Sequence, residues 1–191
     1  MENRKLTTAT ILTLLRMFLI PFLAMAILYS RYGLALLIFL ISGLSDLFDG
    51  FIARRFQQKT KLGALLDPMA DKLLLSSSFL LLTLPGNLAV AIPLWLAVMV
   101  FSRDIFIVVG AVAVALTTGF TKFDPTIYGK ASTFVQIVCV LAVLVANYLR
   151  WNHESIQWLF YLTFALTLFS GIHYIYTFTK RYGEFENVEK K

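Results

Sequence analysis

Residues 128–148 read YGKASTFVQIVCVLAVLVANY, a run of 21 residues in which Lys130 is the only charged side chain. A helix of about 20 apolar residues is long enough to cross the hydrocarbon core of a bilayer. Comparable runs fill most of the chain, at residues 10–29, 33–53, 64–84, 88–116 and 156–179. The sequence therefore predicts an all-α membrane protein with six transmembrane helices.

The composition of the whole chain agrees with this fold class. Apolar residues make up 59% of the 191 positions, charged residues only 15%, and the mean hydropathy is +0.76. A soluble domain carries about 25% charged residues, so a single soluble domain and a disordered chain are excluded. Because the sequence shows neither an internal repeat nor a linker, we expect one membrane domain over residues 1–191, ending in a short polar tail at 180–191.

The basic residues predict the orientation of the helices. With six spans, both termini share one side with the second and fourth loops, and that side holds twelve Lys and Arg residues against only Arg31 and Arg150 opposite. Because basic loops stay inside, we expect both termini to be cytoplasmic. The net charge of +6 then reflects topology and anionic lipid, and no nucleic-acid partner is expected. The start of the chain resembles a signal peptide, but Arg16 interrupts its apolar region.

Four of the eleven acidic residues fall in one 26-residue window. Asp46 and Asp49 end the second predicted helix and Asp67 and Asp71 begin the third, so that each pair lies on one helical face. Carboxylates crowded at a membrane boundary are costly, and hard oxygen ligands suit Mg²⁺ or Mn²⁺. We therefore expect a metal site. The alternative is that the aspartates cap helix ends and pair with neighbouring basic residues.

Small residues accompany the first pair of aspartates. Gly50 and Ala53 leave room for a flat ligand to approach the backbone, and Arg54 is suited to hold a phosphate. Gly63 precedes the second pair, as a turn residue or as a point of close approach. Helix packing through small residues is the alternative interpretation.

Together these residues read D-x2-D-G-x2-A-R-x8-G-x3-D-x3-D, which resembles the signature of the CDP-alcohol phosphatidyltransferases. The resemblance implies transfer of a phosphatidyl group from CDP-diacylglycerol to an alcohol, with release of CMP. It implies that Asp46, Asp49, Asp67 and Asp71 bind a pair of Mg²⁺ or Mn²⁺ ions, and that Asp71 deprotonates the acceptor. By the same resemblance, CDP binding falls to Gly50, Ala53, Arg54 and Gly63, and the protein is a homodimer in a bacterial inner membrane with its active site on the cytoplasmic side.

Three basic residues inside predicted spans are candidates for binding a phosphate of the acceptor: Arg16, Arg103 and Lys130. The stretch Thr13-Leu14-Leu15-Arg16 resembles the start of phosphatidylglycerophosphate synthases and of cardiolipin synthases. The alternatives are interfacial anchoring for Arg16 and Lys130, and pairing with Asp104 or a motif aspartate for Arg103.

The identity of the acceptor is where the clues disagree. Phosphatidylglycerophosphate synthases more often show Ala-Arg-Glu and Gly-Lys-x-Lys-Thr, whereas this chain has Ser-Arg-Asp at 102–104 and Ser132 in place of the second lysine. That pattern is closer to cardiolipin synthases, which use phosphatidylglycerol. We lead with glycerol 3-phosphate because the corresponding enzyme is the commoner bearer of the signature. A UbiA-type prenyltransferase would need a second aspartate-rich motif and a transporter would usually show repeated halves, and neither is visible.

Overall fold

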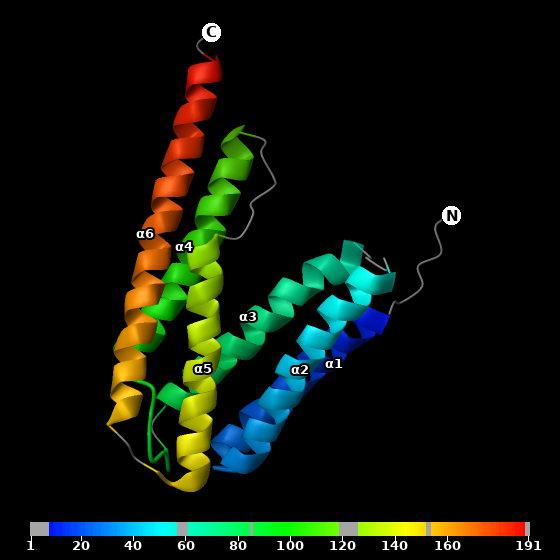
Figure 1. The fold of residues 1–191 in the computed structure, drawn as a ribbon, viewed down its shortest axis with the longest axis vertical. Helices are drawn as coiled ribbons and strands as arrows, with labels where there is room; N and C mark the ends of the chain where they lie inside the picture. Colours follow the sequence, from blue (N-terminus) through cyan, green and yellow to red (C-terminus); the bar gives the residue numbers. More distant parts are fainter. Residues whose placement is uncertain (1–7, 57–60, 85, 119–125, 152–153, 190–191) are drawn as a thin grey trace. The chain divides into compact units, whose positions relative to one another are not determined.

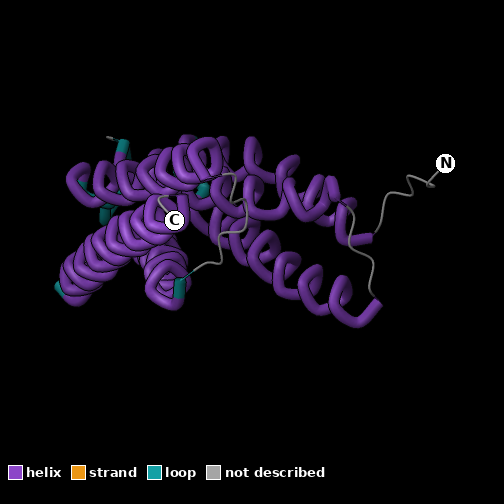
Figure 2. The backbone as a smooth tube through the Cα atoms, turned by 90° about the horizontal axis from the view of Figure 1, so that it is seen from above, coloured by secondary structure: helices purple, strands orange, loops and turns teal. Residues whose placement is uncertain are grey.

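In the part of the chain that the computed structural model describes, there are six α-helices (Figure 1). They are α1 (Thr8–Leu28), α2 (Tyr32–Phe56), α3 (Lys61–Thr83), α4 (Leu94–Thr118), α5 (Ile127–Leu149) and α6 (Ser155–Glu189). The structure describes residues 8–56, 61–84, 86–118, 126–151 and 154–189; inside these ranges, the side chains at 8–10, 46–65, 67–68, 115, 117–118, 178 and 180–189 are not described. No strand occurs in those ranges (Figure 2), which confirms the all-α prediction.

In the described part of the chain, four helices are long and apolar enough to cross a membrane. Within the described residues, the apolar windows are Ile11–Leu28 in α1, Leu94–Val114 in α4, Ile127–Leu149 in α5 and Ser155–Thr177 in α6. The described apolar part of α2 is the shorter segment Tyr32–Ser45. A helical membrane protein is thus confirmed, and the count of six spans stays a prediction.

The start of α4 differs from the sequence prediction. We expected the span to begin at residue 88, but residues 88–93 are not helical and α4 begins at Leu94. Pro93 explains the difference, because proline disfavours helical geometry in the residue before it and is well suited to the first turn of a helix. The Pro93 carbonyl accepts hydrogen bonds from the N–H groups of Leu96 and Ala97.

The end of α6 also differs from the prediction. The helix continues to Glu189, ten residues beyond the expected end at residue 179, so most of the predicted tail at 180–191 is helical. Lys, Arg and Glu are good helix formers, and residues 178–189 contain several of them and no proline. The predicted boundary followed the loss of apolar character, which ends a span but does not end a helix.

The contacts within the chain group the helices into two units, each of which is described by itself. The first unit comprises residues 1–91 and 140–152, and in it α1 packs along both α2 and α3 (Figure 1). The second comprises residues 92–139 and 153–191, and in it α4 packs against α6. Helix α5 contributes its first part to the second unit and its last part to the first.

The distribution of side chains is that of a protein in lipid. Large apolar side chains are exposed along the helices, among them Phe18 on α1, Ile105 and Val109 on α4 and Leu162 on α6. Polar side chains are buried instead: Thr13, Arg16, Ser42, Ser78, Arg103, Ser132, Gln136, Asn147, Thr163, Thr167 and Ser170. Exposed apolar surface on this scale marks a membrane or interaction surface, and buried polar groups need partners inside the helix bundle.

Candidate active site

The two predicted aspartate pairs lie on helices, as their spacing requires. Asp46 and Asp49 are in the last part of α2, and Asp67 and Asp71 are in the first half of α3. In helical backbone, spacings of three and four residues place each pair on one face. The side chains of Asp46, Asp49 and Asp67 lie outside the described ones, so the metal site itself stays a prediction.

The predicted CDP-binding residues occupy the same two helices. Gly50, Ala53 and Arg54 lie in the last two turns of α2, directly after the first aspartate pair, and Gly63 lies in the first turn of α3. Their surroundings are outside the described side chains. The backbone places these four residues at the end of α2 and at the start of α3, the helix that follows it in the chain.

Asp71 is the motif aspartate whose side chain is described, and it meets Arg16. The Arg16 Nη1 group donates a hydrogen bond to Asp71 Oδ1, joining α1 to α3 within the first unit. The Arg16 side chain is 1% exposed and that of Asp71 is 44% exposed. A buried guanidinium needs such a partner to offset its lost hydration. The structure thus brings together the predicted acceptor-binding arginine and the predicted base, at the motif end of the unit.

Arg103 is buried on α4 in the second unit, with partners on two helices. Its Nη1 donates to Asp104 Oδ1 at 2.8 Å and its Nη2 donates to Ser170 Oγ on α6 at 2.6 Å. Its guanidinium carbon lies 5.6 Å from the ring centre of Tyr174, a cation–π distance. The pairing with Asp104 is the alternative weighed from the sequence. The structure thus shows the pairing with Asp104, and binding of the acceptor's phosphate by Arg103 stays a prediction.

The start of α5 contacts the same tyrosine. Thr126 caps the helix, since its Oγ1 accepts the N–H of Gly129 at 3.1 Å. A Cβ atom on Gly129 would lie 3.0 Å from Tyr174 Oη, so the α5 backbone approaches that ring closely. The neighbouring Lys130 is exposed. Tyr174 thus links Arg103 to the first turn of α5, where Lys130 lies.

A buried polar cluster joins α5 to α6 one turn further along. Ser132 Oγ and Thr167 Oγ1 are 3.2 Å apart, and Gln136 Nε2 donates to both at 3.3 Å. Sequence reasoning did not assign Gln136, Thr167 or Ser170 a role. A signal was present, because Thr163, Thr167 and Ser170 recur at spacings of four and three residues, the pattern of one helical face.

The three residues predicted to bind the acceptor phosphate fall in both units. Arg16 belongs to the first unit, and Arg103 and Lys130 belong to the second. The structure gives the surroundings of Arg16 in the first unit and of Arg103 and Lys130 in the second. That all three bind the same acceptor phosphate stays a prediction.

The apolar exterior is that of a helical membrane protein. Its buried arginines and its helical aspartate pairs, the latter through bound metal ions, are suited to bind anionic groups. The chain belongs to the CDP-alcohol phosphatidyltransferase family, which it matches over residues 6–169. This match confirms the family resemblance of the aspartate motif.

Curated relatives carry two different names. The chain is 31% identical to a probable cardiolipin synthase (CMP-forming) of Drosophila melanogaster over 97% of this chain, and 34% identical to the cardiolipin synthase (CMP-forming) of Homo sapiens over 88% of it. The matched region spans 61% of the length of each of these two proteins. The chain is also 35% identical to the CDP-diacylglycerol–glycerol-3-phosphate 3-phosphatidyltransferase of Salmonella choleraesuis, over 87% of this chain and 91% of that protein.

Proposed function

We propose that the protein transfers a phosphatidyl group from CDP-diacylglycerol to the hydroxyl of an alcohol. The acceptor oxygen forms a bond to the lipid-side phosphorus, the bond from that phosphorus to the CMP oxygen breaks, and the hydroxyl proton leaves with a base. The observation that carries this proposal is the complete aspartate motif on α2 and α3, inside a family match that covers residues 6–169. Phosphoryl transfer of this kind depends on positioning and charge neutralisation.

The donor set of the motif fits divalent metal ions. Four carboxylates supply only hard oxygen ligands, the kind that Mg²⁺ and Mn²⁺ prefer, and the helical backbone gives each pair a common face. Asp46, Asp49, Asp67 and Asp71 would hold the ions, which when bound supply positive charge to the diphosphate. Gly50, Ala53 and Gly63 would admit the nucleotide to the backbone, and Arg54 would bind phosphate.

Asp71 is proposed to take the proton from the acceptor hydroxyl. Its partly exposed carboxylate is accessible to a substrate, and the Arg16 guanidinium fixes one of its oxygens. Arg16 is therefore a positioning residue for Asp71 as well as a candidate for contact with the acceptor phosphate.

For the acceptor we propose phosphatidylglycerol, on the evidence of Ser132. Where phosphatidylglycerophosphate synthases more often carry a second lysine, this chain has a fully buried serine bonded within a neutral cluster. An ammonium at that position would be buried among hydroxyl and amide groups. With Ser132 in place of a lysine, the acceptor site has one positive charge fewer. Such a site suits the phosphodiester of phosphatidylglycerol, which has a single negative charge, better than the more highly charged phosphate monoester of glycerol 3-phosphate. The names of the fly and human relatives support the same acceptor.

Glycerol 3-phosphate is the second candidate. It is the acceptor that the commoner bearers of this signature use, and it is named in the Salmonella relative, 91% of whose length is matched.

CMP release by the purified protein tests both the reaction and the acceptor. Mixed micelles would contain CDP-diacylglycerol with Mg²⁺ or Mn²⁺, and phosphatidylglycerol and glycerol 3-phosphate would be offered in separate reactions. We expect chelator-sensitive release with phosphatidylglycerol, and none from Asp49→Ala. Release only with glycerol 3-phosphate would overturn the proposed acceptor, and full activity after chelation would overturn the metal site.

The proposed topology has six spans, cytoplasmic termini and an active site at the cytoplasmic face of a bacterial inner membrane. Its support is the charge distribution of twelve basic residues against Arg31 and Arg150, together with the four apolar helical windows. A homodimer is proposed on family grounds alone.

A further inference from the structure

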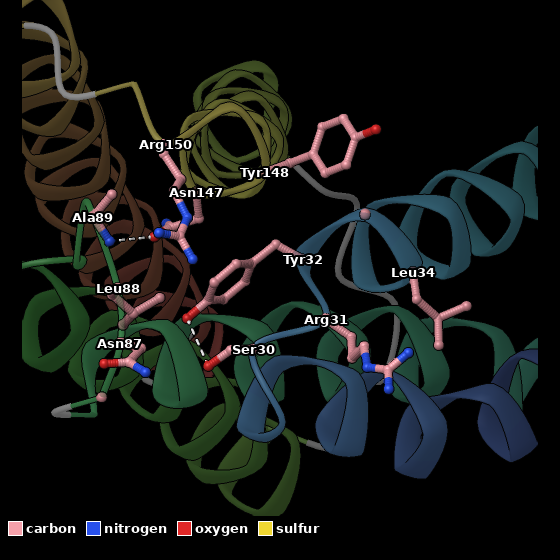
Figure 3. A pocket seen from close by; sticks show the side chains of 12 residues that line it. Ser30, Arg31, Tyr32, Leu34, Asn87, Leu88, Ala89, Asn147, Tyr148 and Arg150 are labelled. Atoms are coloured by element: carbon pink, nitrogen blue, oxygen red, sulfur yellow. Dashed lines mark hydrogen bonds between the residues drawn. The ribbon is translucent and has the colours of Figure 1, made fainter.

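A polar pocket of about 790 Å³ lies in the first unit, at the end of α2 opposite the aspartate motif (Figure 3). Helices α1 and α5 end at this pocket, and α2 begins there. Tyr32, which lines the pocket, and Asp46 in the motif are 14 residues apart on α2, which corresponds to about 20 Å at 1.5 Å per residue. The pocket is therefore separate from the proposed active site.

The charge of the pocket has one sign. Arg31 and Arg150 line it together with neutral polar and apolar residues, and no carboxylate is among the described lining residues. In the described part of the chain neither arginine forms an ion pair. Figure 3 shows the Arg150 side chain and the Tyr32 ring extending into the same space. The Arg31 side chain lies apart from these two, on the side of Leu34 (Figure 3). The Arg150 guanidinium, in a concave polar site, is therefore the group suited to bind a phosphate.

The walls of the pocket are held by one buried side chain. Asn147 Oδ1 accepts the N–H groups of Ala89 at 2.7 Å and Val90 at 3.3 Å, and its Nδ2 donates to the Val90 carbonyl at 2.7 Å. This clamp ties the connection between α3 and α4 to the end of α5. Beside it, a Cβ atom on Gly33 would lie 2.8 Å from the Tyr148 ring, so α2 begins in close contact with α5. The pocket is thus preformed.

Two lining residues adopt a backbone conformation that favours glycine. Ser30 has φ 56° and Arg150 has φ 52°. Each follows a helix, and each helix ends in the same hydrogen-bond pattern, with Arg31 N–H bonded to Ala26 O and Trp151 N–H to Ala146 O, both at 2.8 Å. Glycine would be less strained at both positions. Backbone strain of this kind concentrates at functional sites. Arg150 is both strained and a lining residue of the pocket, so its backbone conformation supports a role there.

Apolar side chains at the same helix ends indicate a ligand with hydrocarbon chains. Tyr29, Leu34, Leu149 and Trp151 are all exposed around the pocket residues. Aromatic side chains beside basic ones are typical of the boundary between lipid tails and head groups. We propose that the pocket binds the phosphate of an anionic phospholipid in the leaflet facing away from the aspartate motif.

The test uses the purified chain of 191 residues in neutral detergent. Binding of dihexanoyl-phosphatidylserine, an anionic lipid outside the proposed reaction, would be measured by calorimetry, with dihexanoyl-phosphatidylcholine and inorganic phosphate as separate titrants. We expect phosphatidylserine to bind most tightly, Arg150→Gly to weaken it about tenfold, and Arg150→Lys to weaken it less. Ser30→Gly is the comparison variant, because it relieves the same backbone strain and removes a lining hydroxyl bonded to Tyr32 but no charge. It should therefore weaken phosphatidylserine binding less than Arg150→Gly does.

Folding and catalysis provide independent readouts. Arg150→Gly should keep or raise the melting temperature, since glycine suits its backbone, so weaker binding would not reflect unfolding. CMP release should be unchanged in this variant, which separates the lipid site from the proposed reaction. Equal phosphatidylserine affinity in Arg150→Gly and the wild type would overturn the proposal. Inorganic phosphate binding as tightly as the lipid would overturn the assignment to a phospholipid.

Discussion

Arg16 and Asp71 form the interaction that links the candidate active site to the first helix. The guanidinium is fully buried, whereas the carboxylate is partly exposed. Removing a buried charge's partner is more destabilising than removing both members of the pair, because the remaining group loses its compensation. The interaction between Arg16 and Asp71 can therefore be measured from the stability of variants, independently of any catalytic role.

A double-mutant cycle should therefore detect coupling between the two residues. We expect Arg16→Gln and Asp71→Asn each to lower the melting temperature in detergent, and the double variant to be less destabilised than their sum predicts, by about 1–2 kcal/mol. Thermal unfolding of the four proteins would give this value. Additivity within about 0.5 kcal/mol would show that the pair does not contribute as described.

Gly129 is a second position at which one atom matters. A methyl group there would lie 3.0 Å from Tyr174 Oη and 3.2 Å from Thr126 Oγ1, tighter than ordinary contact. We expect Gly129→Ala to shift the Tyr174 ring away from Arg103 and to raise the acceptor KM several-fold, while the KM for CDP-diacylglycerol stays unchanged.

Steady-state CMP release with each substrate varied in turn would measure both constants. Gly43→Ala is the matched control, since nothing lies within 4 Å of a Cβ atom at Gly43 and alanine favours helix there. An unaltered acceptor KM in Gly129→Ala would remove the start of α5 from the acceptor site.

At the scale of the elements, Asn147 connects the end of α5 to the segment between α3 and α4. Its amide satisfies the buried N–H and C=O groups of Val90, which no helix pairs. We expect Asn147→Ala to destabilise the protein by about 2–3 kcal/mol, the cost of leaving buried backbone groups without partners.

Unfolding in detergent, followed by tryptophan fluorescence, would measure the loss. Ser77→Ala is a suitable comparison, because the Ser77 hydroxyl bonds to carbonyls of its own helix, those of Leu73 and Leu74, and its removal should change stability by less than about 0.5 kcal/mol. Equal stability of the two variants would show that Asn147 does not hold this segment.

The helices could be predicted from the sequence because a membrane span requires a long apolar run. The ends of α4 and α6 could not, because the apolar run and the helix do not end at the same residue. Pro93 was visible in the sequence, yet only the structure shows that Ala89 and Val90, in the segment before α4, are bonded to the side chain of Asn147. The aspartate motif was recognisable from spacing alone. The Arg16–Asp71 contact was not, since it depends on how α1 packs against α3, and sequence periodicity gives the face of a helix but not its neighbour.

At the scale of the whole molecule, the orientation in the membrane is the property with the most direct test. Cys139 is the only cysteine and is fully buried, so the native chain is a suitable background for labelling of introduced thiols. We expect Gly86→Cys to react with a membrane-impermeant maleimide in intact cells, and Glu186→Cys to react only after lysis. The opposite pattern would reverse the proposed topology.

Helix α6 has a practical consequence for imaging this protein by electron microscopy. Its 35 residues rise about 52 Å, whereas its apolar window ends at Thr177. The twelve residues from 178 to 189 therefore continue for about 18 Å beyond that window. A rigid fiducial protein that begins with a helix could be fused in phase to this extension, giving electron microscopy a landmark that rotates and tilts with α6 and with α4, which packs against it.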